Sequence, residues 1–148
     1  MEPDELAELR TMYIFIPPDG QTWNLTFPGL EAILRRREPD AFIRIDEGTH
    51  GPVTGTSMDF EITLDDELLE GMALLSPEGV TVKDATARSA ATFALWLRNN
   101  AVPAGMAMVF NTAWGVEDDL PDTPVPDATR PRIAAAFMAH LVEAGDLD

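Results

Sequence analysis

The sequence predicts an α+β fold: one mixed β-sheet of five to six strands, with two to three helices packed mainly on one face. Short apolar or alternating segments are typical of strands, and three longer segments repeat their apolar residues at the helical period. The length of 148 residues suits a single domain spanning the whole chain. The expected order is strand, helix, four strands, helix, strand, helix.

The middle of the sheet is expected from the run 71–112. Met72–Leu75 and Val80–Val82 are predicted to pair as a hairpin, because Pro and Gly in the intervening segment 76–79 favour a tight turn. A helix over 86–100 should follow, with a buried stripe at the helical period. The uninterrupted apolar segment 106–110 is then a central strand, and a strand–helix–strand connection of this length predicts parallel pairing.

The N-terminal third should supply a strand and a helix. Residues 1–9 form either a short helix or a frayed tail. Segment 11–16 is apolar almost throughout and predicts an interior strand. Pro28 suits the start of a helix that Pro39 closes, and three arginines at 35–37 suit its negative C-terminal end.

Two more strands are expected before the hairpin. Segment 41–46 alternates well enough for a half-buried strand, and segment 58–64 places its apolar residues on one face and its polar residues on the other. Asp65–Glu67 predicts a tight connection in the form of one helical turn, which Gly71 would terminate.

The C-terminal part contains the longest segment without periodicity. Residues 113–128 combine Trp114 with three prolines and five acids, and loops of this length are commonly functional or disordered. A last helix is predicted over 130–144.

The charge is the most unusual property of the composition. Ten basic and 26 acidic residues give a net charge of −16, and Lys83 is the only lysine. This field excludes nucleic acid and anionic membranes as partners and favours a basic protein. The chain has no cysteine and no apolar run of membrane-spanning length, and its first residues are acidic. We therefore expect a cytoplasmic, bacterial protein without cofactors, and leave the oligomeric state open, a homodimer included.

Catalytic chemistry has few residues to use. His50 stands near Asp46 in a Gly/Thr-rich loop, and such a pair could act as a general base with an orienting carboxylate. A solvated loop histidine is the simpler interpretation. His140 and Glu143 share one helix face, but no second pair exists to complete a metal site, so no metal is predicted.

The candidate binding residues are two tryptophans and the acids beside one of them. Tryptophan is enriched at binding hot spots, and charged neighbours steer a partner of opposite sign. The predicted binding residues are Trp114, Glu117, Asp118, Asp119 and Trp23. The alternative is that each indole folds back onto the core.

The leading hypothesis is therefore a non-catalytic, acidic protein-binding domain, such as an intracellular inhibitor or immunity-type protein for a basic partner. One alternative is a small enzyme or ligand-binding domain with a pocket near His50. Another is an accessory or structural subunit. Fold class alone does not distinguish these functions.

Overall fold

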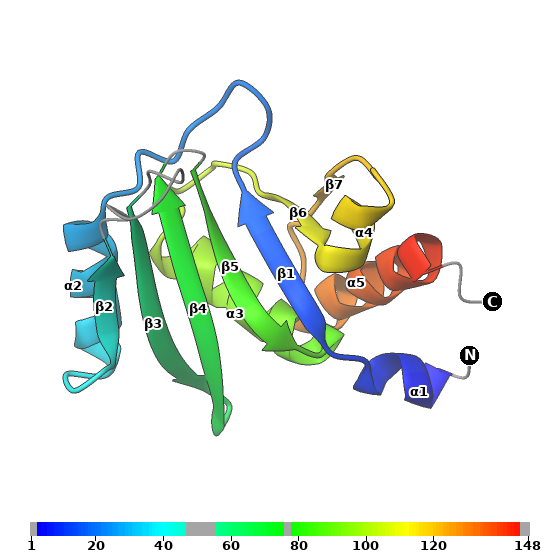
Figure 1. The fold of residues 1–148 in the computed structure, drawn as a ribbon, viewed down its shortest axis with the longest axis horizontal. Coiled ribbons are helices and arrows are strands. Elements are labelled where there is room, and N and C mark those ends of the chain that lie inside the picture. The colour runs from blue at the N-terminus through cyan, green and yellow to red at the C-terminus, as the bar shows by residue number, and fades with distance from the viewer. Residues whose placement is uncertain (1–2, 47–55, 76–77, 146–148) are drawn as a thin grey trace.

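The computed structural model describes residues 3–46, 56–75 and 78–145. They form an α+β fold built on one seven-stranded sheet with the order β2-β3-β4-β5-β1-β6-β7 (Figure 1). The strands are β1 Thr11–Ile16, β2 Ile43–Asp46, β3 Ser57–Leu64, β4 Glu67–Leu75, β5 Glu78–Ala85, β6 Val109–Thr112 and β7 Thr123–Pro124. The helices are α1 Pro3–Glu8, α2 Phe27–Arg37, α3 Ala87–Asn100, α4 Ala113–Glu117 and α5 Arg130–Gly145. The predicted class is confirmed, with slightly more elements than expected.

The prediction of a mixed sheet with β5 paired to β6 is wrong. Each pair of neighbouring strands is antiparallel. Strand β1 lies between β5 and β6 and bonds to both, so these two strands run parallel but do not touch. The helical crossover therefore leaves room for one strand, which the N-terminal segment fills. As predicted, β1 is an interior strand.

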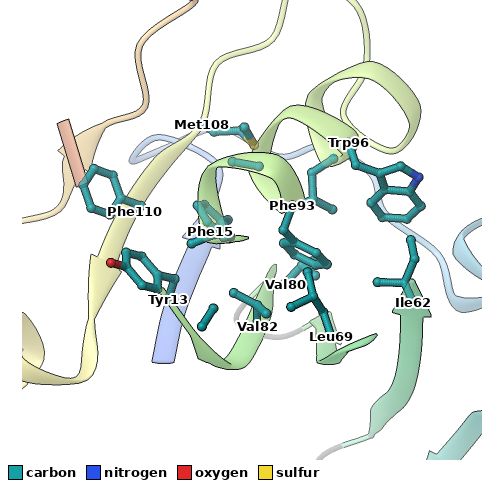
Figure 2. Close-up of a cluster of buried hydrophobic side chains, with 14 of the residues drawn as sticks. Tyr13, Phe15, Ile62, Leu69, Val80, Val82, Phe93, Trp96, Met108 and Phe110 are labelled. Atoms are coloured by element: carbon teal, nitrogen blue, oxygen red, sulfur yellow. The ribbon is translucent and has the colours of Figure 1, made fainter. Parts of the chain in front are cut away.

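The core lies between one face of the sheet and the helices α3 and α5, which pack against each other (Figure 1). Figure 2 shows Phe93 and Trp96 of α3 among strand side chains such as Ile62 and Val80. The predicted inward residues of β3 are all buried, as is the predicted stripe of α3; they are Met58, Phe60, Ile62, Leu64, Ala90, Phe93, Ala94 and Leu97. Helix α3 begins after Thr86, whose hydroxyl accepts a hydrogen bond from the Ser89 N–H. Alternation in the strands and the helical period therefore located the core correctly.

The connection between β3 and β4 differs from the prediction. Asp65 and Asp66 form a two-residue hairpin turn with φ of 50° and 64°, and no helical turn follows. Gly71 lies inside β4 and does not terminate a helical turn. A Cβ at this position would lie 2.3 Å from the Phe60 ring, so the glycine makes room for that ring in the core.

The segment 113–128 is more ordered than predicted. It begins with α4 and contains the short edge strand β7. Helix α4 is capped by Thr112, whose hydroxyl accepts the Gly115 N–H at 3.1 Å. At the other end of the chain, the first of the two predicted alternatives holds, because residues 3–8 form helix α1.

Candidate functional site: an acidic surface around α4

Helix α4 presents a compact group of charged and apolar side chains. Trp114 is half-buried, while Val116 is 53% exposed. Glu117, Asp118 and Asp119 follow and are exposed. Within the described part of the chain, these three carboxylates make no hydrogen bond or ion pair through their side chains. The predicted residues around Trp114 therefore lie together, and their charge is not neutralised by neighbouring residues.

A buried polar network holds α4 against α5. Thr112 Oγ1 lies 3.0 Å from His140 Nε2, and both side chains are buried. Burial lowers the pKa of His140, although Glu143 acts in the opposite direction. Because the Gly115 N–H already donates to Thr112 Oγ1, the hydroxyl proton is available to a neutral imidazole. The acidic surface therefore rests on a fixed support.

The Asn111 side chain extends this network to Leu120 and Asp122, which follow the acids of α4. Its Nδ2 donates to the Leu120 carbonyl oxygen at 3.0 Å and to Asp122 Oδ1 at 3.1 Å. Its Oδ1 accepts the Thr112 N–H at 2.9 Å. These bonds use every direction of the amide except one acceptor position, and they fix where the chain returns after α4.

The Thr112–His140 pair has the separation of a nucleophile and its base, but not the accessibility. Thr112 is fully buried, and His140 is 4% exposed. No substrate atom can approach Oγ1 unless α4 moves away. The pair therefore supports the fold.

Trp23 lies in a different environment from Trp114. Its side chain is 3% exposed, and Nε1 donates to the Ala107 carbonyl oxygen at 3.0 Å. The backbone on either side is held by Glu78, which accepts the N–H groups of Trp23 and Leu25 at 2.8 and 2.7 Å. A buried indole offers no contact surface, so among the two tryptophans only Trp114 is accessible to a partner.

The Glu78 carboxylate that holds this segment is ionised more readily than usual. Burial opposes its ionisation, but hydrogen bonds from Leu25, Thr22 and Trp23 outweigh burial and lower the pKa of Glu78. The residues 22–25 are therefore fixed to the start of β5 by a charged acceptor.

The alternative site near His50 falls largely outside the described residues, and only Asp46 is described. It is exposed and is the last residue of β2. Across the described residues, no group of three or more potential ligands could hold a metal ion. None of the helices in those residues is both long and apolar enough to cross a membrane.

The structure contains a basic cleft that was not predicted from the sequence. It has a volume of about 530 Å³ between α2 and α3 and is lined by Ile33, Arg36, Arg37, Trp96 and Asn100. Arg37 donates through Nε to the Thr63 carbonyl oxygen at 3.1 Å. The Arg36 side chain has no partner in the described ranges. A run of arginines at a helix end is explained by the helix dipole, so it does not by itself indicate a cleft.

Comparisons of this chain with models of known protein families, with curated proteins and with solved structures find no match.

Proposed function

We propose that this chain is a non-catalytic, acidic domain that binds a basic protein, in the manner of an inhibitor or immunity-type protein. The observation that carries the proposal is the group of unneutralised carboxylates beside Trp114 on α4. Such a group combines an aromatic anchor with charges that accelerate encounter with a cationic partner. The net charge of −16 extends the same attraction over the whole molecule. The proposal keeps the cytoplasmic location predicted from the sequence.

The rigidity of α4 supports a binding role. A contact surface held in one conformation loses little entropy when the partner docks. Helix α4 has only five residues, so it depends on Thr112 and His140 for its position. A buried polar network at this place is explained if the exposed side of α4 must stay fixed.

The experiment is affinity capture from the lysate of the native host at about 50 mM and about 300 mM salt. Three forms of the chain are compared: the wild type, Trp114→Ala with Asp118→Asn and Asp119→Asn, and the control Glu5→Gln with Glu8→Gln. The control removes the same number of charges from exposed positions of α1.

The expected result is one basic protein that the wild type and the control retain at low salt and that the α4 variant loses. High salt should release it, because attraction between exposed charges is screened. Equal capture by all three forms would contradict the site. Absence of any retained protein at low salt would contradict the function.

A further inference from the structure

The second face of the sheet carries a band of apolar side chains. The described residues place no helix on this face, which Figure 1 shows in front of α3. Met12, Ile14 and Ile16 of β1 point to it, and Met72 and Leu74 of β4 continue it on the other side of β5. All five side chains are half-buried. An antiparallel sheet with one wet face normally carries polar residues there, so this band is a departure.

Unpaired acids border the band at its β3–β4 side. Glu61 and Glu70 lie directly opposite each other on these strands. Neither carboxylate has a hydrogen-bond or ion-pair partner in the part of the chain that the structure describes. Like charges placed opposite each other destabilise a sheet. The pair is therefore a repulsive interaction that no described residue neutralises. Such unfavourable interactions are typical of functional positions.

The nearby basic residues do not neutralise this pair. Arg44 Nη2 lies 2.9 Å from Asp59 Oδ2, and Lys83 Nζ lies 3.2 Å from Asp59 Oδ1. Burial opposes ionisation of Asp59, but these two cations outweigh it and lower its pKa. Asp59 therefore engages both cations on this side of the face, and the charge of Glu61 and Glu70 remains.

The acidic segment after α4 borders the same face at the opposite side. Asn111 of the neighbouring strand β6 pairs with Ile14, and its side chain is buried against α4 and the residues that follow it. That side chain holds Leu120 and Asp122 by the two hydrogen bonds of its amide. The apolar band therefore has carboxylates at both of its margins.

We propose that this face is the docking surface for a basic amphipathic helix of the protein partner, an inference that rests on the proposed function. The apolar stripe of the helix would cover the band, and Lys or Arg residues near both ends would meet the acids at the two margins. In the order of the sheet, β3 and β6 are the first and last of five neighbouring strands. They are separated by four interstrand spacings of about 4.8 Å, or about 19 Å in total. A helix of about 13 residues spans that distance.

Other occupants fit the face less well. A second copy of the chain would bring the Glu61–Glu70 pair and a net charge of −16 against the same charges. A partner strand would add to the edge strands β2 or β7 and leave the face uncovered. A helix is also one of the common second layers on a sheet. Phe42 and Leu68, which are 49% and 59% exposed, offer apolar contacts for the stems of long basic side chains.

The test uses a synthetic helix of about 18 residues, with leucines at helical spacing and lysines near both ends, and the labelled chain observed by NMR at low salt. A scrambled peptide of the same composition has no apolar stripe and serves as the peptide control. Two variants alter the face: Glu61→Gln with Glu70→Gln, and Ile14→Thr with Met72→Thr. The Glu5→Gln/Glu8→Gln variant is the charge control.

The expected result is a set of chemical-shift changes on β1, β4 and β5 with the amphipathic peptide and much weaker changes with the scrambled one. The Ile14/Met72 variant should bind about tenfold more weakly, and the Glu61/Glu70 variant about threefold to tenfold more weakly. The control variant should bind as the wild type does. Because shift mapping needs only the wild type, the test survives if one variant fails to fold.

Two results would overturn the inference in distinguishable ways. Shift changes confined to α4, abolished by Asp118→Asn with Asp119→Asn alone, would remove the sheet face as the docking surface and leave the proposed function standing. No binding of the amphipathic peptide to the wild type at low salt would overturn the inference. If the captures from the host lysate also retained nothing, the proposed function would fail with it.

Discussion

Glu61 and Glu70 face each other on the neighbouring strands β3 and β4, on the side of the sheet without helices. We predict that Glu70→Lys stabilises the free chain by about 0.5–1 kcal/mol, because it converts a repulsive cross-strand pair into an attractive one. The measurement is the free energy of unfolding in urea. Glu5→Lys on α1 makes the same change of net charge and is the control.

The same Glu70→Lys variant should bind the basic partner helix more weakly, although its free energy of unfolding should be higher. This opposite movement of stability and binding is typical of residues retained for function. A variant no more stable than the Glu5→Lys control would show that the two carboxylates do not repel each other measurably.

A second prediction concerns the hairpin turn between β3 and β4. Asp66 adopts φ of 64°, which glycine adopts more readily than any other residue. Asp66→Gly should therefore stabilise the chain by about 0.5–1 kcal/mol. Asp66→Ala keeps a Cβ and should give no gain, so it is the matched control. Thermal unfolding distinguishes them, and a lower melting temperature for the glycine variant would contradict the turn assignment.

This turn also shows where reasoning from the sequence was limited. Two aspartates without glycine give a weak hairpin signal, so Asp65–Glu67 reads equally well as a helical turn. The strand β3 before it was located correctly, because its alternation reports burial on one face directly. Local patterns therefore predicted elements well, while an unusual backbone conformation required the structure.

The candidate site was predictable only in part. The acids beside Trp114 could be identified from the order of residues, because side-chain charge can be read directly from the sequence. The partial exposure of Ile14 was not predictable, because a strand that is apolar on both sides is expected to be covered on both sides. Whether a helix covers the second face depends on where distant helices pack. The position of β1 between β5 and β6 has the same origin in tertiary structure.

A third prediction tests the support beneath α4. A Cβ on Gly115 would lie 2.0 Å from Asn111 Oδ1 and 2.9 Å from His140 Nε2. Gly115→Ala should therefore cost about 1–3 kcal/mol of stability and weaken binding at the Trp114 surface. Urea unfolding measures the first effect, and titration with the basic partner measures the second.

The control for Gly115→Ala is a double-mutant cycle with Asn111→Ala. Removing the Asn111 amide removes the nearest obstacle, so the loss caused by Gly115→Ala should be smaller in that background. Additive losses would show that the contact with Asn111 is not what excludes a side chain at position 115.

A fourth prediction concerns the Tyr13 hydroxyl, which is buried and has no hydrogen-bond partner among the described residues. Burial also raises the pKa of this phenol. Tyr13→Phe keeps the ring packed 5.1 Å from the Phe137 ring centre and removes the unsatisfied group. The variant should be as stable as the wild type or more stable, by up to about 1–3 kcal/mol. Tyr13→Leu, which loses the ring contact, should be less stable. A destabilised phenylalanine variant would reveal a partner for the hydroxyl, such as a bound water molecule.

The last prediction follows from the buried imidazole of His140. Burial lowers its pKa in the folded chain below the ordinary value of 6.5, so the unfolded chain binds a proton more readily. Stability from this residue is therefore complete above about pH 6.5 and falls as the pH decreases below it, by at most about 1.4 kcal/mol per pH unit. His140→Gln keeps an acceptor for the Thr112 hydroxyl but does not titrate, so its unfolding free energy should change less between pH 7 and pH 5. The carboxylates Asp59 and Glu78, whose pKa values are lowered, lose their contributions at more acidic pH and do not obscure this window. If His140→Gln and the wild type lost stability in parallel over this range, the buried imidazole would not be the group that titrates.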